Sequence, residues 1–291
     1  MSKAGVLLLI HCGYSFAEEL ISNAAARELE SFVLSSHSLP GNNHRIVELQ
    51  EKSTWFCESE DHALTWQDVE QALKQLAEQG YRIACCLSVW EGYRVLMAKA
   101  NQILGVADME PAQVELLLNK YELRQWLHQK GLSQVNAVLL DQQTWIDLQA
   151  KGKAAFVKPV TGIASYGSFP LTLDKRWQDL EKIQSDIEAD LRYRSIFSAN
   201  RGFMAEDYIL GQEFSFEIIA IEGDTFVVAI HEKLEVDESG FAVLADACVA
   251  PPIHLDEVQL HKARAWVAKL FEHLKLQWGC YHLEARYHKD H

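Results

Sequence analysis

The sequence predicts an α/β protein in two parts: a first part built on a parallel sheet, and a second, α+β part that contains antiparallel sheet. Three observations support this prediction. A continuous apolar run near the N-terminus, AGVLLLIHCG at 4–13, is typical of a strand buried on both faces. Strand and helix patterns then alternate up to about residue 104. Beyond residue 203, apolar residues alternate with a period of two, which indicates antiparallel strands with one exposed face.

The first part is predicted to run over residues 1–105. Its expected elements are a strand in the run 4–13, a helix at 16–30, a helix between Thr65 and Gly80, a strand at 81–89 and a helix at 91–104. Because strand, helix, strand and helix follow one another, the sheet should be parallel with right-handed crossovers. This arrangement is Rossmann-like, although the segment HCGYSF after the first strand lacks the G-x-G-x-x-G pattern of dinucleotide sites.

The second part is predicted to run over residues 106–291, with a lid subdomain at roughly 120–205. Its expected elements are two short helices within 108–132, a strand near 135–140, helices near 143–150 and 175–192, β-strands within 203–236, a helix at 256–275 and a last strand at 278–288. Asn119 with Glu122 three residues later has the spacing of a helix-capping box. Gly223-Asp224 between two β-rich runs predicts a hairpin turn.

Composition and charge limit the classes of partner. The chain has 291 residues, is 48% hydrophobic and carries a formal net charge of -14. Such an acidic chain repels nucleic-acid phosphates and anionic lipid, and the sequence has no local basic patch, so we expect neither a nucleic-acid nor a membrane partner. The opening apolar run is too short for a signal peptide, and no stretch is long enough to span a membrane. We therefore expect a cytoplasmic protein.

The six cysteines are expected to be reduced and mostly buried. They form no C-x-x-C pair and no zinc-like spacing, and they are Cys12, Cys57, Cys85, Cys86, Cys248 and Cys280. Because adjacent residues of a strand point to opposite faces, Cys85 and Cys86 should lie on the two sides of one sheet.

Two lysines are candidates for anion binding. Lys158 ends a predicted strand just before Pro159 and a loop rich in Gly and Ser, so its ammonium could bind an anion together with loop N–H groups and the Ser165 hydroxyl. Lys120 lies in the first turn of a predicted helix, where its charge opposes the helix dipole unless an anion is bound. The alternative is that both are ordinary solvated lysines beside an exposed loop.

Several acidic residues are candidates for ligand or metal binding. Glu206, Glu213 and Glu217 cluster along one predicted strand, where the alternative is a solvated polar face. Glu284 shares a face of the last strand with four other residues that include possible metal ligands, namely Cys280, His282, Arg286 and His288. A zinc site there is a minor alternative, because ligands in line on one strand converge poorly.

The order of these segments resembles the ATP-grasp superfamily, and more narrowly its carboxylate–amine ligases, which include L-amino-acid ligases and relatives of carbamoyl-phosphate synthase. FVKPVTGIAS at 156–165 and EDYILGQEFSFE at 206–217 carry the resemblance. SVWEGYRVLMAKANQILGV at 88–106 is similar to the segment that joins the pre-ATP-grasp domain to the nucleotide-binding part. The resemblance covers residues 5–291 and is weak before residue 80.

The resemblance implies a role for each candidate. Lys120 and Lys158 would be the two phosphate-binding lysines, and the loop from Thr161 through Gly162 and Ser165 to Gly167 would close over the β- and γ-phosphates. Glu206 would accept a hydrogen bond from the adenine amino group. The backbone of Asp207, Tyr208 and Ile209 would lie beside the ring edge, Glu213 would bind the ribose hydroxyls, and Glu284 would be the first Mg²⁺ carboxylate. The implied cofactors are ATP and Mg²⁺.

Two features depart from the family pattern. Ala164 stands where the family usually has a second loop glycine, which narrows the conformations open to the loop. In the family, a further hairpin strand supplies a second acidic Mg²⁺ ligand, an asparagine and an arginine at the reaction centre, and this sequence ends at HKDH before such a strand. We expect a truncated form or a variant with half a metal site, in which Asp290 is a poor substitute ligand and turnover is crippled.

The expected function is therefore an ATP-dependent ligase that joins a small carboxylate, such as an amino acid, to an amine through an acyl phosphate. No side chain is expected to act as a covalent nucleophile. The resemblance also allows a homodimer. One alternative is an ATP-binding module without turnover that signals its conformation to a partner protein. A Rossmann-type dehydrogenase is a third hypothesis, disfavoured by the absent dinucleotide pattern.

Overall fold

The computed structural model of the chain describes residues 4–14, 16–152, 154–197 and 202–287. Contacts divide the chain into two compact units, the first made of 1–115 with 186–199 and the second of 116–185 with 200–291. The segment 186–199 therefore belongs to the first unit, although the chain reaches it from the second. Among the described residues, no helix combines the length and apolarity that crossing a bilayer requires.

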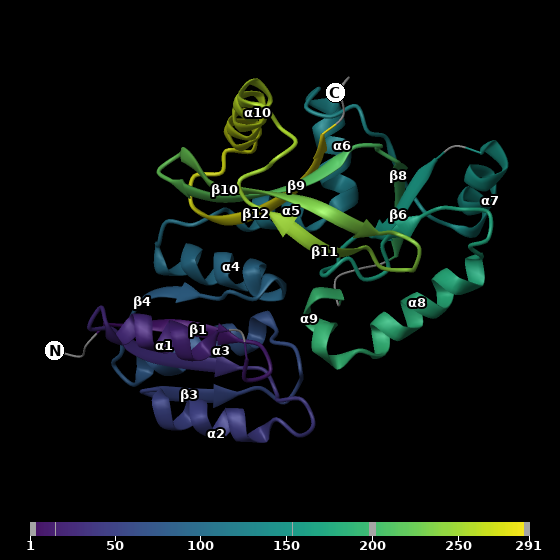
Figure 1. Cartoon of the computed structure of the whole chain (residues 1–291). Coiled ribbons are helices and arrows are strands. Elements are labelled where there is room, and N and C mark those ends of the chain that lie inside the picture. Colours follow the sequence, from purple (N-terminus) through teal and green to yellow (C-terminus); the bar gives the residue numbers. More distant parts are fainter. Residues whose placement is uncertain (1–3, 15, 153, 198–201, 288–291) are drawn as a thin grey trace. The chain divides into compact units, whose positions relative to one another are not determined.

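The first unit is built on a four-stranded parallel sheet with strand order β3-β2-β1-β4 (Figure 1). Its strands are β1 (Ala4–Ile10), β2 (Glu30–Ser35), β3 (Trp55–Glu58) and β4 (Arg82–Leu87). Its helices are α1 (Ala17–Ala25), α2 (Asn43–Lys52), α3 (Trp66–Glu78), the 3-10 turn Glu91–Tyr93, α4 (Arg94–Leu104), the 3-10 turn Leu191–Tyr193 and α9 (Arg194–Phe197). The parallel sheet and the capped helix after Thr65 confirm the sequence-based expectations.

The sheet of the first unit is buried on both faces. Alternate residues of β1 enter two separate apolar clusters, with Leu7 and Leu9 on one side and Val6 and Leu8 on the other. Cys86 packs in the first cluster and Cys85 against the second, as the alternation along a strand predicts. This double burial explains why β1 reads as a continuous apolar run.

The region between β1 and α3 differs from expectation. The helix predicted over 16–30 ends at Ala25, and the chain turns through left-handed Glu28 into β2. β2 is almost wholly buried, and the burial of its apolar side chains in the sheet outweighs the helical spacing of the preceding residues. The sequence analysis also missed α2 and β3, whose patterns are short and weak.

His11 follows β1 and lies in a neutral hydrogen-bonded cluster of the first unit. Its Nε2 lies 2.6 Å from the carbonyl of Arg192, which can only accept, so Nε2 carries the proton. Its Nδ1 then accepts from the Tyr93 hydroxyl at 3.2 Å, and its ring stacks on Trp90 with centroids 4.2 Å apart. Burial is the main cause that lowers the pKa of His11. The cluster thus anchors the segment around Arg192 without charge.

The second unit contains two antiparallel sheets, of strand order β11-β10-β9-β12 and β5-β8-β6-β7. The strands are β5 (Ala137–Leu139), β6 (Ala155–Pro159), β7 (Phe169–Pro170), β8 (Phe203–Asp207), β9 (Gln212–Ile221), β10 (Asp224–Asp237), β11 (Leu244–Val249) and β12 (Gly279–Tyr287). The helices are α6 (Lys120–Gln129), α7 (Gln142–Lys151) and α10 (Glu257–Leu274), while α5 (Pro111–Leu118) and α8 (Trp177–Ala189) cross the boundaries between the units in sequence. These elements match the predicted order.

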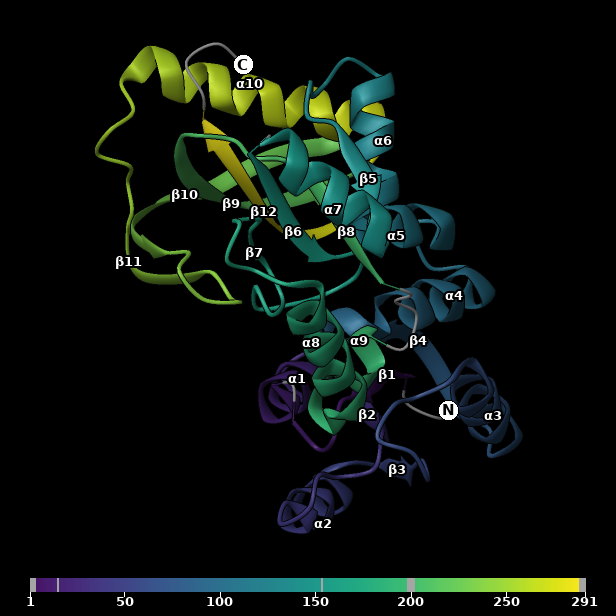
Figure 2. The same cartoon turned by 90° about the vertical axis from the view of Figure 1, so that its right-hand side faces the viewer.

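The sheet of β11, β10, β9 and β12 has the longer strands and is called the larger sheet. It has one apolar and one polar face. Phe214, Phe216 and Ile218 of β9 are buried, and α10 lies along one face of the sheet (Figure 2), with Phe271 packing edge-to-face on Tyr281 of β12. The hairpin turn predicted at Gly223 joins β9 to β10 through two left-handed residues, as a tight β-hairpin requires. Polar side chains of β9, β10 and β12 consequently gather on the other face.

The thiols are less buried than the composition suggested. All six cysteines are free, but only Cys12 and Cys86 are buried, and Cys248 and Cys280 are exposed. Both exposed thiols lie on the outermost strands of the larger sheet, β11 and β12. The expectation of mostly buried cysteines is therefore wrong for the second unit, because edge strands with one open face leave alternate side chains in solvent.

Candidate functional site

Glu206 at the end of β8 lies between two cations. Its Oε1 accepts from Lys158 Nζ at 2.6 Å and its Oε2 from Arg124 Nε at 2.9 Å. Lys158 reaches it from the neighbouring strand β6, and Arg124 from α6. The Glu206 side chain is only 9% exposed. The solvated-strand interpretation of Glu206 is therefore wrong.

The charges of this group follow from its burial and partners. Burial alone raises the pKa of Glu206, but the two adjacent cations outweigh it, so the pKa lies below its ordinary value. Burial lowers the pKa of Lys158, and the nearby carboxylate opposes this effect. Glu206 is thus an ionised acceptor with lone pairs to spare. Lys158 has no acceptor other than Glu206 among the described residues, so two of its N–H groups remain available.

Of residues 207–209, Ile209 is the one whose backbone N–H is available to a ligand among the described contacts. The N–H of Asp207 donates to the Asn136 carbonyl, and that of Tyr208 donates to the Ala154 carbonyl. The Asp207 carboxylate also accepts from Asn136, so its side chain is used structurally. Within the described part of the chain, the Ile209 N–H has no acceptor. Of the predicted backbone segment, Ile209 is therefore the residue that can donate to a bound molecule.

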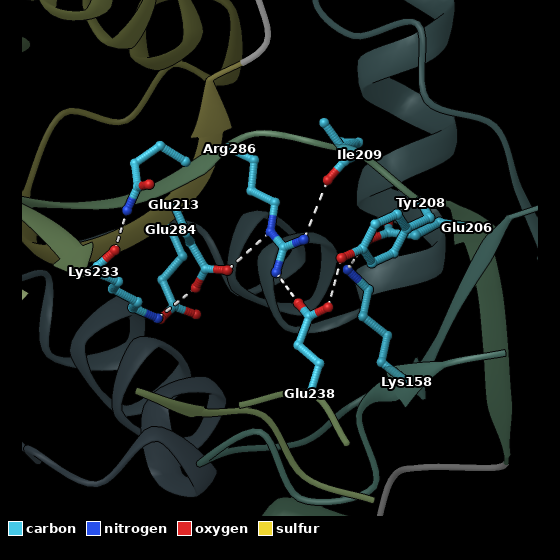
Figure 3. Close-up of polar contacts among 10 residues, drawn as sticks. Lys158, Glu206, Tyr208, Ile209, Glu213, Lys233, Glu238, Glu284 and Arg286 are labelled. Atoms are coloured by element: carbon cyan, nitrogen blue, oxygen red, sulfur yellow. Dashed lines mark hydrogen bonds and ion pairs between the residues drawn. The ribbon is translucent and has the colours of Figure 1, made fainter. Parts of the chain in front are cut away.

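Glu213 lies next to this segment and is also held by two cations (Figure 3). Its Oε1 accepts from Lys233 Nζ of β10 at 2.5 Å, and its Oε2 accepts from Arg286 Nε of β12 at 3.0 Å. The side chain of Glu213 is 14% exposed. Its two oxygens are fixed in direction, and each keeps a lone pair for a further donor.

Glu284 projects from β12 into the same network, where Lys233 bridges it to Glu213 (Figure 3). His282 is the second partner of Glu284, and it also approaches Glu217 at 2.8 Å. The ion pair with His282, whose Nε2 lies 3.8 Å from Glu284 Oε1, is the largest cause that lowers the pKa of Glu284 to about 2, and the same pairing raises the pKa of His282 to about 9. Glu284 is half-exposed and ionised, and Glu217 is partly exposed.

The loop between β6 and β7 presents backbone donors. Among the described residues, the N–H groups of residues 162–165 have no acceptor, while Gly167 N donates to the Phe241 carbonyl at 3.1 Å. Ala164 and Ser165 both adopt left-handed conformations, with φ of 55° and 54°, which few residues other than glycine take up readily. Ala164 therefore follows the glycine-like path at a conformational cost. Successive N–H groups without an internal acceptor are suited to binding an anion.

Lys120 begins α6 and reaches this loop. Its Nζ donates to the Gly162 carbonyl at 2.7 Å, and its N–H donates to the Val160 carbonyl at 2.8 Å. The Asn119 side chain caps the helix by accepting from Glu122 N at 3.1 Å, which confirms half of the predicted capping box. The structure therefore brings Lys120 to the loop that Lys158 precedes. Thr161 also has interaction partners.

Residues 238–242, which follow β10, contact both the loop between β6 and β7 and the segment after Glu206. Glu238 accepts from the Tyr208 hydroxyl at 2.6 Å and pairs with Arg286. Lys175 Nζ donates to the carbonyls of Ser239 and Gly240 at 3.0 and 3.1 Å. Together with the Gly167–Phe241 hydrogen bond, these contacts tie residues 238–242 both to the loop and to the segment after Glu206.

The comparisons with known proteins point to one family. Residues 153–291 match the ATP-grasp domain model, a range that contains Lys158, Glu206, Glu213 and Glu284. This part of the chain is therefore similar to ATP-grasp domains. Lys120 and Arg124 precede the matched range, and the structure brings them to the domain through α6.

The chain as a whole is similar to carboxylate–amine ligases. Dapdiamide A synthase of Enterobacter agglomerans is 25% identical over 190 residues, which cover 64% of this chain and 43% of the synthase. The crystal structure of L-amino acid ligase from Bacillus licheniformis superposes with a TM-score of 0.71 at 20% identity, over 99% of this chain and 66% of the ligase. The crystal structure of D-alanine–D-alanine ligase from Bacillus anthracis complexed with ATP superposes with a TM-score of 0.58 at 12% identity, over 99% of this chain and 83% of that ligase. The chain thus spans less than two thirds of the first two relatives.

The network contains four residues that the sequence patterns did not nominate for the nucleotide site. They are Arg124, Lys233, Glu238 and Arg286, of which the sequence patterns indicate Arg286 only as a neighbour of the alternative zinc site. The strand register gives a signal for one of them, since Arg286 is paired directly with Glu213 across β12 and β9. No group of three His, Cys, Asp or Glu suited to a metal occurs among the described residues. His288 of the zinc alternative and Asp290 lie outside those residues.

Proposed function

We propose that the second unit binds ATP and that the protein uses it to ligate a small carboxylate to an amine. The Lys158–Glu206 pair carries this proposal. An ionised carboxylate accepts from the amino group of adenine, and a lysine beside it with free N–H groups is suited to the phosphates. The match to the ATP-grasp domain and the similarity to amino-acid ligases support the reaction class.

Each part of the nucleotide has a candidate partner in this arrangement. Glu206 would accept from the adenine amino group while the Ile209 N–H donates to a ring nitrogen. Glu213 would accept from ribose hydroxyls. Lys120, Lys158 and the N–H groups of the loop from Thr161 through Gly162 and Ser165 would bind the phosphates, with charge assistance that strengthens each hydrogen bond.

Glu284 fits one position in the shell of a Mg²⁺ ion. It is an ionised, half-exposed carboxylate, and Mg²⁺ in such sites commonly takes one or two carboxylates together with phosphate oxygens and water. When bound, the metal would neutralise negative charge on the phosphates. Lys233 and His282 neutralise Glu284 in the described structure, so both would have to share it with the metal or move away.

The protein's own residues would act by positioning and electrostatics. Transfer of the γ-phosphoryl group to the substrate carboxylate would give an acyl phosphate, and attack of the amine would form the amide and release phosphate. Lys120 and Lys158 would stabilise negative charge on the transferring group. No described side chain is required as a covalent nucleophile.

Calorimetric titration of the chain with ATP, with and without Mg²⁺, tests the nucleotide site. We expect saturable binding of one ATP, and the absence of binding in both conditions would reject the proposal. Phosphate release can then be measured with ATP, Mg²⁺ and pairs of amino acids. Release that depends on the amino acids would support the ligase, whereas binding without release under any pair would favour an ATP-binding module.

A further inference from the structure

Arg286 connects three separate parts of the proposed nucleotide site, yet none of the proposed roles in ATP binding uses it. Its Nε donates to Glu213 Oε2 at 3.0 Å, its Nη1 to the Ile209 carbonyl at 3.2 Å, and its Nη2 to Glu238 (Figure 3). The side chain is only 16% exposed. One guanidinium thus holds a strand carboxylate, a backbone carbonyl and the segment 238–242.

The guanidinium restricts the segment around Ile209 from two sides. Its plane is rigid, so donation to the Ile209 carbonyl fixes that peptide relative to Glu213. The same group lies 5.4 Å from the centroid of the Tyr208 ring, whose hydroxyl is bound by Glu238. The available N–H of Ile209 therefore lies between the Ile209 carbonyl, which Arg286 binds directly, and the Tyr208 side chain, which Arg286 holds mainly through Glu238.

Glu213 is oriented by the same guanidinium. With Lys233 on one oxygen and Arg286 on the other, the carboxylate cannot rotate without losing a charge-assisted hydrogen bond. Its remaining lone pairs are consequently directed. A carboxylate that accepts from a ribose needs this fixed direction, because the 2′- and 3′-hydroxyls lie at a set distance from the base.

We infer that Arg286 is a positioning residue that makes base and ribose recognition act together. It fixes the position of the Ile209 N–H relative to the Glu213 carboxylate, so that a nucleoside can bind both groups at the same time. The inference rests on the proposed ATP site. Its three nitrogens donate to protein groups, so its effect on a nucleoside would pass through the two groups that it holds.

The test compares the binding of ATP and 2′-deoxyATP by calorimetry in wild type and Arg286→Met. Wild type should prefer ATP, because 2′-deoxyATP lacks a hydroxyl that Glu213 would bind. In the variant we expect ATP affinity to fall about 10-fold, 2′-deoxyATP affinity to fall less, and the preference to disappear. A merely structural role would weaken both nucleotides by the same factor, and a preference that survives unchanged overturns the inference.

Two further variants make the test specific. Arg286→Lys keeps the positive charge but loses the planar, forked set of guanidinium donors. It should therefore recover part of the ATP affinity and little of the preference for ATP over 2′-deoxyATP. If Arg286→Met does not fold, this variant provides the test. Arg176→Met removes an arginine from an exposed pair with Asp179 and should change neither nucleotide. A wild type that binds neither nucleotide would reject the ATP site itself, whereas normal wild-type binding with an unaffected Arg286→Met rejects only the role of Arg286.

Discussion

The His11 cluster of the first unit and the Glu206–Glu213 network of the second both bury titratable side chains, but they do so in opposite charge states. Around His11, burial lowers the pKa of the imidazole and raises those of Cys12 and Tyr93, so all three groups are neutral. Around Glu206 and Glu213, two cationic side chains accompany each carboxylate, and those beside Glu206 hold its pKa below the ordinary value.

This difference separates a cluster that joins chain segments from one suited to a charged ligand. A neutral cluster loses little on burial as long as its hydrogen bonds are made, and the ring nitrogens of His11 are both engaged. Ionised groups are costly to bury and are stable only beside opposite charges. Where such groups also retain free donors, as Lys158 does, an anionic ligand can complete them.

Removal of the Lys158 ammonium should have the largest effect. Lys158→Ala should weaken ATP binding roughly 100-fold or more, because a charge-assisted phosphate contact is lost and Glu206 is left beside Arg124 alone. Calorimetric titration measures this loss. Lys151→Ala, at an exposed lysine of α7, is the matched control and should bind ATP as wild type does. Equal affinity in the two variants would sink the assignment of Lys158 to the phosphates.

The stability of the first unit should instead be sensitive to added side-chain volume in its core. A Cβ at Gly5 would lie 2.3 Å from the Phe32 ring and 2.8 Å from the Glu30 carbonyl. Gly5→Ala should therefore lower the free energy of unfolding by about 2 kcal/mol, measured by urea denaturation. Gly240→Ala, where the nearest heavy atom is 3.9 Å away, should change it by less than about 0.5 kcal/mol. If Gly5→Ala were equally harmless, the close packing of β1 against β2 would be disproved.

The two histidines should give pH effects of opposite sign. The folded pKa of His11 lies below 6.5, so protons favour the unfolded state and stability falls as the pH drops below 6.5. The folded pKa of His282 is about 9, so its contribution is complete below pH 6.5 and is lost as the pH rises toward 9. Because His282 is 56% exposed, that contribution should stay under about 1 kcal/mol.

Thermal melting between pH 5 and 9.5 measures both effects. His11→Gln should flatten the pH dependence on the acid side, and His282→Gln should flatten it on the alkaline side. Each variant serves as the control for the other. If His11→Gln left the acid side of the pH dependence unchanged, His11 would not be neutral in the folded protein. If His282→Gln left the alkaline side unchanged, His282 would not be charged there.

The smallest perturbation is thiol labelling of the native protein. Cys248 and Cys280 of the second unit are exposed and should react first with an aromatic disulfide reagent at pH 8. The thiols of the first unit should react slowly, since burial raises the pKa of Cys12, Cys57, Cys85 and Cys86. Peptide mapping identifies the labelled residues, and rapid labelling of Cys86 would show that the first unit opens readily.

Much of the fold could be predicted because local patterns encode it. The apolar run of β1, the Thr65 cap, the period-two alternation of β9 and the turn at Gly223 each act over a few residues, and all four are confirmed. The end of α1 at Ala25 could not be predicted in this way. It depends on β2 joining β1 in the sheet, a pairing between separated segments.

The sequence by itself determined the two-part α/β organisation and nominated Lys158, Glu206, Glu213 and Glu284 as chemically important. Only the tertiary structure decided their partners. Arg124 and Glu206 are separated by 82 residues and Arg286 and Glu213 by 73, yet each pair is in hydrogen-bond contact. Such pairs depend on strand register and helix placement, which are set by the burial of apolar faces, so no spacing within a short segment reveals them.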